Sequence, residues 1–369
     1  MATQVMFRRW AGSLAAVVLI ASALGLAGGG PAAARSVTAA ARLPVAALTG
    51  VAATSARNAW AVGYTNRYHP VILHWNGASW TKARLPALPR SGATELNGVA
   101  ATSARNAWAV GIAGSNDNLI LHWNGVRWSR VMPLRRAGEL FGVTAISASD
   151  VWAVGTLDNG PIPAGLMVLH WNGKVWKQVP CPNPYNAGGL YGVSARSADD
   201  VWAVGYTGKQ GIILHWNGSV WKRSAVRLHR DGNPLHAVAA PVASDVWAVG
   251  ESSYGLSLIV RWDGTAWKHY QAPRPTLGGG LQGVTATSAR NAWAVGFGNS
   301  GRAFFTWIFR WNGRAWVRVP SPQAALRGAL LDVTATSARN AWAVGYLGFI
   351  NPSRALILHW NGKTWTPAT

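Results

Sequence analysis

The feature that most constrains this chain is a four-residue motif, Trp-Ala-Val-Gly, which occurs seven times. The copies begin at Trp60, Trp108, Trp152, Trp202, Trp247, Trp293 and Trp342. Successive copies are 48, 44, 50, 45, 46 and 49 residues apart. A period of this length, built from short apolar runs and turns, predicts the blades of a β-propeller.

A second motif, Trp-Asn/Asp-Gly-x-x-Trp, follows each copy of the first. Together the two motifs predict four strands per repeat, which in the first repeat are residues 48–53, 59–64, 71–75 and 78–82. Asn76-Gly77 predicts a two-residue type I′ turn between the last two strands. That turn would pair Trp75 with Ala78 and would make Trp75 and Trp80 diagonal neighbours on one face.

The repeats predict an all-β chain in which residues 47–369 form a single seven-bladed β-propeller with four antiparallel strands per blade. We expect the repeats to start near residues 48, 96, 140, 190, 235, 281 and 330. A blade cannot bury its apolar faces alone, whereas blades stacked in a ring can. Three tryptophans per repeat account for 21 of the 23 in the chain, and we expect them to fill the spaces between blades.

Residues 1–34 have the pattern of an export signal peptide, and residues 35–46 that of a linker. Arg8 and Arg9 precede an apolar stretch at 10–27, which ends in a Gly-Pro segment and a run of alanines. We therefore expect a secreted, extracellular protein with no membrane span in its mature chain. The pattern leaves the general and twin-arginine export routes both open.

The chain is strongly basic, with a formal net charge of +22 from 34 Lys and Arg against 12 Asp and Glu. Arginine outnumbers lysine by 27 to 7, so codon usage in a GC-rich genome is one explanation of the charge. The other is attraction to an anionic partner. The single cysteine, Cys181, excludes an intramolecular disulfide.

The repeated pattern Ser-Ala-x-Asn/Asp-x-Trp-Ala-Val-Gly, followed by His-Trp-Asn-Gly-x-x-Trp, resembles the secreted propeller-repeat proteins of high-GC soil bacteria. More distantly it is similar to tectonin-type propellers, several of whose relatives are lectins. The resemblance covers residues 48–369 and implies the propeller fold. Through the tectonin-type relatives it also implies carbohydrate binding. The chain departs from WD repeats, because the repeat-ending Trp-Asp and the Gly-His pair are absent.

The two faces of such a propeller differ in how much the repeats vary. The turn face carries the connections from first to second and from third to fourth strand, and these are nearly the same in every repeat. The loop face carries the other connections, which vary in length and composition, so we predict the binding site there. Aromatic rings beside polar groups suit sugars, although capping of blade ends is the alternative role for these rings. The candidate ligand-binding residues are Tyr64, Arg67, Tyr206, Glu251, Tyr254, Phe297, Arg302 and Tyr346.

The turn face has one asymmetry. Repeats one, two, six and seven carry arginine at one turn position, and repeats three to five carry Ser or Asp there. The arginines are Arg57, Arg105, Arg290 and Arg339; the other residues are Ser149, Asp199 and Ser244. The basic half is a candidate surface for an anionic partner, and recent duplication of blades is the alternative explanation.

The sequence gives little support for an enzyme. Asp150, Asp200 and Asp245 occupy the Asn/Asp turn position, where capping is the expected role. Glu95 and Glu139 fall near the loop face, but no spacing marks the carboxylate pair of a glycosidase. The histidines of the His-Trp pairs recur once per blade, which favours a structural role. We expect no metal and no cofactor.

The leading hypothesis is a secreted, non-enzymatic binding protein that recognises a glycan or an anionic cell-envelope polymer through the loop face. The first alternative is an extracellular protein–protein interaction scaffold. The second is a polysaccharide lyase or hydrolase with its site at the central channel, where Asp332 is expected on an innermost strand. We expect a monomer, and nucleic acid is not an expected partner.

Overall fold

The computed structural model describes the chain from residue 45 to residue 368 with short gaps. The described ranges are 45–89, 92–114, 117–131, 137–158, 163–185, 187–208, 210–228, 233–252, 255–273, 278–299, 304–322, 327–348 and 354–368. The expected signal peptide, most of the linker, Tyr254 and Arg302 lie outside these residues. In the part of the chain that the structure describes, no helix has the length and hydrophobicity needed to cross a membrane.

The described secondary structure consists of strands β1–β28, arranged as seven blades of four antiparallel strands. Blade one contains β1 (Ala47–Ser55), β2 (Asn58–Tyr64), β3 (Pro70–Trp75) and β4 (Trp80–Lys82). Blade two contains β5 (Glu95–Ser103), β6 (Asn106–Ala113), β7 (Asp117–Trp123) and β8 (Trp128–Arg130). Blade three contains β9 (Gly138–Ser147), β10 (Asp150–Asp158), β11 (Pro163–Trp171) and β12 (Trp176–Gln178). Blade four contains β13 (Gly188–Ser197), β14 (Asp200–Thr207), β15 (Gln210–Trp216) and β16 (Trp221–Arg223).

The last three blades follow the same order. Blade five contains β17 (Leu235–Val242), β18 (Asp245–Glu251), β19 (Ser257–Trp262) and β20 (Trp267–Tyr270). Blade six contains β21 (Gly279–Ser288), β22 (Asn291–Asn299), β23 (Phe304–Trp311) and β24 (Trp316–Arg318). Blade seven contains β25 (Gly328–Ser337), β26 (Asn340–Leu347), β27 (Arg354–Trp360) and β28 (Trp365–Pro367). The predicted seven-bladed β-propeller is confirmed.

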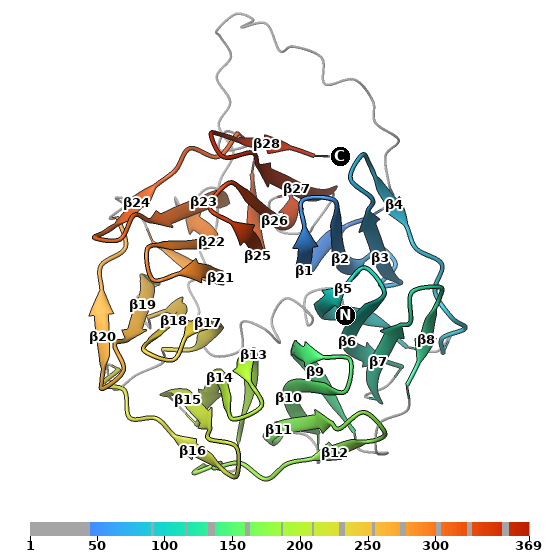
Figure 1. The fold of residues 1–369 in the computed structure, drawn as a ribbon, viewed down its shortest axis with the longest axis horizontal. Helices are drawn as coiled ribbons and strands as arrows, with labels where there is room; N and C mark the ends of the chain where they lie inside the picture. The colour runs from blue at the N-terminus through green and yellow to red at the C-terminus, as the bar shows by residue number, and fades with distance from the viewer. Residues whose placement is uncertain are drawn as a thin grey trace, which may run out of the picture.

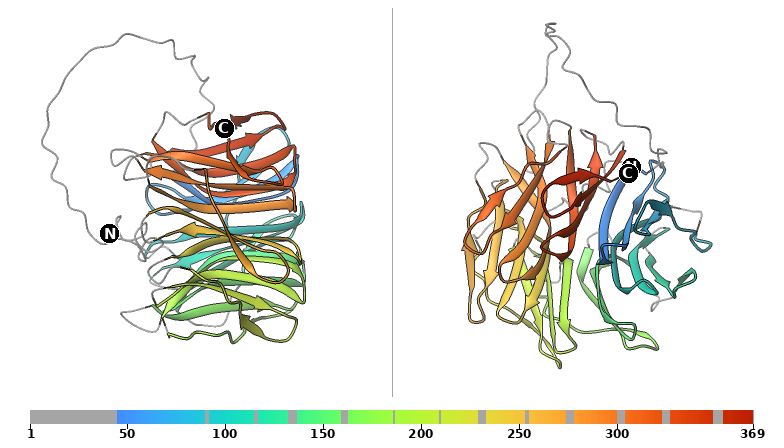
Figure 2. Two further views of the ribbon diagram at one scale, coloured as in Figure 1. Left: turned by 90° about the vertical axis from the view of Figure 1, so that its left-hand side faces the viewer. Right: turned by 45° about the horizontal axis from the view of Figure 1, so that its top comes forward.

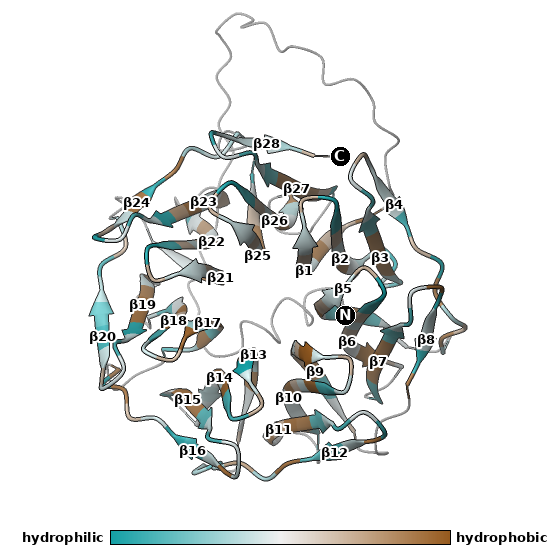
Figure 3. Cartoon of the chain, viewed as in Figure 1, coloured by the Kyte–Doolittle hydropathy of each residue, from teal (hydrophilic) through white to brown (hydrophobic). Residues whose placement is uncertain are grey.

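The blades stand around a central channel, with the first strand of each blade innermost and the short fourth strand on the rim (Figure 1). Seen edge-on, the strands run between the two faces of a thick disc (Figure 2). Apolar residues concentrate on middle strands such as β7, β15 and β19, whereas the rim strands β16 and β20 are largely hydrophilic (Figure 3). This distribution follows from burial, because middle strands pack against neighbouring blades on both sides and rim strands meet water.

The hairpin between the third and fourth strands differs from the prediction. Trp75 pairs directly with Trp80, so the loop is the four residues Asn76–Ser79 and the two tryptophans are opposite, not diagonal. Gly77 has a positive φ of 98°, but Asn76 is not among the positive-φ residues, which excludes a type I′ turn. The reason is the Asn76 side chain, whose Oδ1 accepts the backbone N–H groups of Ala78 and Ser79 at 2.9 and 3.0 Å. This side-chain cap stabilises the longer loop.

The tryptophans fill the junctions between blades, as predicted. Trp60 stacks on His74 of its own blade with ring centroids 4.1 Å apart, and meets Trp123 and Trp128 of blade two at 5.2 Å each. Equivalent contacts occur at every junction around the ring. Trp307, the one tryptophan of the repeats outside the two motifs, is also buried, in the core between blades five and six.

Blade one and blade seven close the ring without sharing a strand among the described residues. Trp342 of blade seven packs against Trp75 and Trp80 of blade one, in the same way as at the other junctions. Two hydrogen bonds join the chain ends: Ala355 N–H donates to the Val45 carbonyl at 2.9 Å, and Val51 N–H donates to Asp332 Oδ2 at 2.8 Å. Asp332 lies on the innermost strand β25, as expected.

Candidate functional site

A cavity of about 450 Å³ opens on the turn face between blades four and five. Cavities of roughly 300–1,000 Å³ are typical of small-molecule sites. The turn between β13 and β14 forms one side of it, and the blade-five residues Ala243, Trp262 and Gly264 form the other. The polar and aromatic lining residues that matter here are Arg196, Asp199, Asp200, Trp202, His215 and Trp262.

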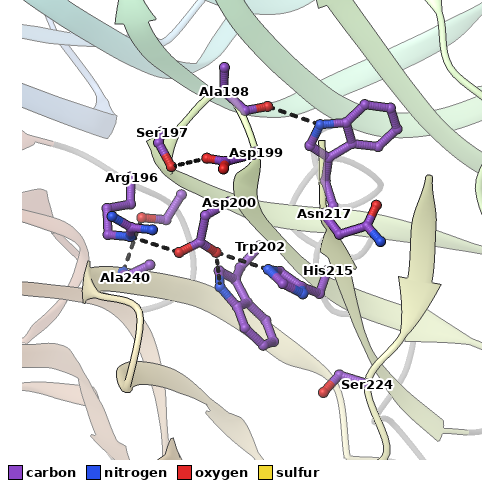
Figure 4. Close-up of polar contacts among 12 residues, drawn as sticks. Arg196, Ser197, Ala198, Asp199, Asp200, Trp202, His215, Asn217, Ser224 and Ala240 are labelled. Carbon is purple, nitrogen blue, oxygen red and sulfur yellow. Dashed lines mark hydrogen bonds and ion pairs between the residues drawn. The ribbon is translucent and has the colours of Figure 1, made fainter. Parts of the chain in front are cut away.

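Asp200 is the centre of the polar network in this cavity (Figure 4). Its Oδ1 accepts the Trp202 indole N–H at 2.8 Å and His215 Nε2–H at 2.9 Å. Its Oδ2 accepts Arg196 Nε–H at 2.8 Å. The Asp200 side chain is 8% exposed, whereas those of Arg196 and His215 are 41% and 33% exposed. The network therefore holds a buried anion and presents a guanidinium and an imidazole to the cavity.

The sequence of blade four produces this network by changing two residues of a common arrangement. In blade one, Asn58 Nδ2 donates to Thr54 Oγ1, and Asn58 Oδ1 accepts from His74. Blade four has Asp200 in place of the asparagine and Arg196 in place of the threonine. A carboxylate can only accept hydrogen bonds, and the Arg196 guanidinium supplies a charged donor at the threonine position.

The junction between blades four and five is wider than the others. Trp202 and Trp262 have ring centroids 5.8 Å apart, against 4.9–5.4 Å at the six other junctions. In the six other blades the tryptophan equivalent to Trp262 donates its indole N–H to the alanine carbonyl of the turn beside it. Trp262 makes no such bond within the described residues, since Pro241 and Val242 change its turn. A half-buried indole whose N–H makes no hydrogen bond within the described residues therefore lines the cavity.

The second carboxylate of the cavity, Asp199, is exposed at the tip of the turn. The Ser197 hydroxyl donates to Asp199 Oδ1 at 2.5 Å, and this bond lowers the pKa of the carboxyl. Asp199 is thus an anion that can accept hydrogen bonds from a ligand. With the indole rings beside it, the cavity has the groups that bind a polar, hydroxyl-rich molecule with an apolar face.

Of the six predicted loop-face residues that the structure describes, four are buried. Tyr64, Phe297 and Tyr346 are 9%, 3% and 3% exposed, and they belong to one apolar cluster with alanines of blades one and seven. Burial raises the pKa of Tyr346 to about 12. These three rings cap blade ends and are not exposed stacking platforms.

The other predicted residues are scattered on the loop face. Tyr206 is half-buried and Arg67 is exposed. Glu251 is 7% exposed, and its carboxylate lies over Gly280, where a Cβ atom would be 2.6 Å from Glu251 Oε2. The loop of blade one adds a residue that the sequence did not single out, Tyr68, which has φ 56° and stacks on Tyr64 at 5.7 Å.

The central channel holds a smaller cavity of about 180 Å³. Its lining includes Asn97, Tyr191, His236 and Asp332. The acidic residues nearest the loop face, Glu95 and Glu139, are 2% and 9% exposed, and Asn97 Nδ2 donates to Glu139 Oε1 at 3.0 Å. No group of three or more His, Cys, Asp or Glu side chains in the described residues is arranged to hold a metal ion.

From sequence, Asp200 and His215 have structural roles, and no role is predicted for Arg196. The signal that marks this cavity is an exception within the repeats. Repeat four alone combines arginine at position 196 with adjacent acids at 199 and 200.

The chain matches no family model and no curated protein sequence. Solved β-propellers are similar to it in structure. The BP39L lectin from Burkholderia pseudomallei matches with a TM-score of 0.61 at 12% identity, over 88% of this chain and 99% of the lectin. YCF48 from Cyanidioschyzon merolae matches with a TM-score of 0.57 at 16% identity, over 86% and 97% of the two chains. A xyloglucanase from Xanthomonas campestris matches with a TM-score of 0.60 at 13% identity, over 88% of this chain and 55% of the enzyme. At these identities the likeness shows the fold alone.

Proposed function

We propose that this protein is a secreted, carbohydrate-binding β-propeller that holds a sugar in the cavity between blades four and five. The observation that carries the proposal is that exposed Asp199 and Arg196 converge with half-buried His215 and Trp262 on one cavity. Structural likeness to a lectin propeller supports a binding role for the fold. Secretion is inferred from the export pattern of residues 1–34.

In this site the sugar's apolar face lies against Trp262 and its hydroxyls bond to Asp199, Arg196 and the indole N–H. Asp200 already accepts three protein donors and its side chain is 8% exposed, so it orients Arg196 and His215 instead of contacting the sugar.

The test is binding of residues 35–369 to a glycan array, followed by affinity measurements on the best ligand with Asp199→Ser. Serine occupies this turn position in blades three and five, so the fold tolerates the change. Loss of an ionised acceptor that contacts the ligand should weaken binding by roughly tenfold. The matched control is Asp117→Ser, which removes an exposed carboxylate from the loop face and should leave the affinity unchanged.

The same array separates the alternatives. Loss of binding in Tyr206→Ala and not in Asp199→Ser would place the sugar on the loop face, as the sequence predicted. Absence of any glycan ligand would favour the protein-interaction scaffold. Release of reducing ends from a bound polysaccharide would favour a hydrolase at the channel.

A further inference from the structure

The turn face carries an uncompensated set of cations on four adjacent blades. Arg57, Arg105, Arg290 and Arg339 occupy the same turn in blades one, two, six and seven, which are contiguous once the ring closes. All four side chains are exposed, and none of them forms an ion pair within the described ranges.

The neighbouring hairpin loops of the same blades extend this set. Blades two, six and seven place Arg127, Arg314 and Lys363 in the loop between the third and fourth strands, and all three are exposed. The hairpin loop touches the turn in each blade: a Cβ atom at Gly125 would lie 3.0 Å from Arg105 Cβ. The basic arc, defined as these three residues and the four turn arginines, therefore extends over four adjacent blades.

Among the described residues, acidic side chains on this face are confined to the other three blades, and four of the five pair with a basic side chain of their own blade. Asp150, Asp200, Asp245 and Asp263 pair with His170, Arg196, Arg261 and Lys268 respectively. Asp199 accepts the Ser197 hydroxyl. The charge of the basic arc is thus neutralised neither within its own blades nor by neighbours across the face.

We propose that the basic arc binds a linear polyanion, a surface polymer that carries a phosphodiester or carboxylate group on each repeating unit. A single small anion would bind weakly, because each arginine is exposed and its attraction for the anion is screened by salt. A polymer makes several such contacts at once and releases its condensed counterions on binding. The fork of donors on each guanidinium suits both phosphate and carboxylate. This proposal does not depend on the sugar cavity.

The test compares two variants of residues 35–369 that lose the same charge. The arc variant carries Arg57→Ser, Arg105→Ser, Arg290→Ser and Arg339→Ser; serine at this turn position in blades three and five shows that the turn accommodates it. The control variant carries Lys82→Ser, Lys177→Ser, Arg318→Ser and Arg354→Ser, which are exposed positions outside the arc. Thermal unfolding of both variants verifies the fold.

The probes are polyphosphate and polygalacturonate, with affinities measured at about 50 mM and about 500 mM NaCl. The arc variant should bind at least one polymer roughly tenfold more weakly at low salt and with a shallower salt dependence, while the control stays within about threefold of the original. If the arc variant loses affinity for one polymer and not for the other, the result identifies the anionic group that the arc binds. Equal losses in the two variants would overturn the proposal in favour of net charge, as would an unchanged arc variant. Asp199→Ser should retain polyanion binding, which separates this surface from the cavity.

Discussion

Individual positions in the repeats are filled by different residues that make the same contact. The histidine before the second motif bonds to Asn in blade one at 2.8 Å and to Asp in blade three at 2.8 Å. In blade five, Arg261 replaces the histidine, bonds to Asp245 at 2.6 Å and lies over the Trp247 ring at 4.8 Å. The position therefore requires a flat donor that stacks on the tryptophan, and either imidazole or guanidinium meets that need.

Asp200→Asn tests whether Asn and Asp can replace one another at this turn position in blade four. Three donors point at the Asp200 carboxylate, and an amide would turn its own N–H₂ group toward one of them. We expect a loss of about 2 kcal/mol in the free energy of unfolding, since a buried network would be left partly unsatisfied. Chemical denaturation measures this loss of free energy. The matched control is Asp150→Asn in blade three, because blades one, two, six and seven have asparagine at this position. The control should lose roughly 0.5 kcal/mol or less of unfolding free energy. Equal losses at the two sites would contradict the special role of the blade-four network.

The same histidines make stability depend on pH. Burial lowers the pKa of His74, His122 and His359 below the ordinary value of 6.5. As the pH falls below about 6.5, the unfolded chain takes up protons that the folded chain does not, so the free energy of unfolding decreases. We expect the melting temperature to fall between pH 7 and pH 5. The triple variant His74→Gln, His122→Gln, His359→Gln should lower this sensitivity, while His69→Gln, at an exposed position, should not. A triple variant with the original pH profile would refute the assignment.

At the scale of strands and turns, the sequence predicts periodic features well and side-chain caps poorly. The blade count, the strand positions and the tryptophans at the junctions follow from repetition, because a residue that recurs seven times meets the same environment seven times. The hairpin prediction was wrong because Asn76-Gly77 also begins a longer loop when the asparagine side chain caps the N–H groups of Ala78 and Ser79. The dipeptide is the same in both cases, so local sequence does not distinguish them.

The cavity between blades four and five could not be predicted from sequence, because it depends on residues from two different repeats. It depends on the spacing between Trp202 and Trp262, which lie on different blades and are 60 residues apart in the chain. Each residue of the cavity has a structural role within its own repeat. The cavity itself becomes visible only when blades four and five are placed side by side. The loop-face aromatics show the same limit, since Phe297 and Tyr346 lie in one buried cluster with alanines of blades one and seven.

At the scale of the whole molecule, the junction between blades seven and one is the place where the two ends of the chain meet. Five blades have glycine on the innermost strand where blade seven has Asp332. At Gly50 a Cβ atom would lie only 3.0 Å from the Asn97 carbonyl of the next blade, which keeps those inner strands in close backbone contact. Between blades seven and one, the Asp332 carboxylate instead reaches across and accepts the Val51 N–H at 2.8 Å, while its other oxygen accepts the N–H of Val333 on its own strand at 2.8 Å.

Replacement of Asp332 by the glycine of the other blades should therefore weaken the ring where it closes. Loss of the bond to the Val51 N–H in a half-buried site should cost roughly 1–2 kcal/mol of unfolding free energy. Hydrogen–deuterium exchange should rise in peptides that cover β1 and β25, and not in β13 on the far side of the ring, because opening begins where covalent continuity is absent. Asp332→Asn keeps one acceptor and should recover part of the protection. If Asp332→Gly leaves exchange in β1 unchanged, tryptophan packing at Trp342, Trp75 and Trp80 closes the ring without help from the carboxylate.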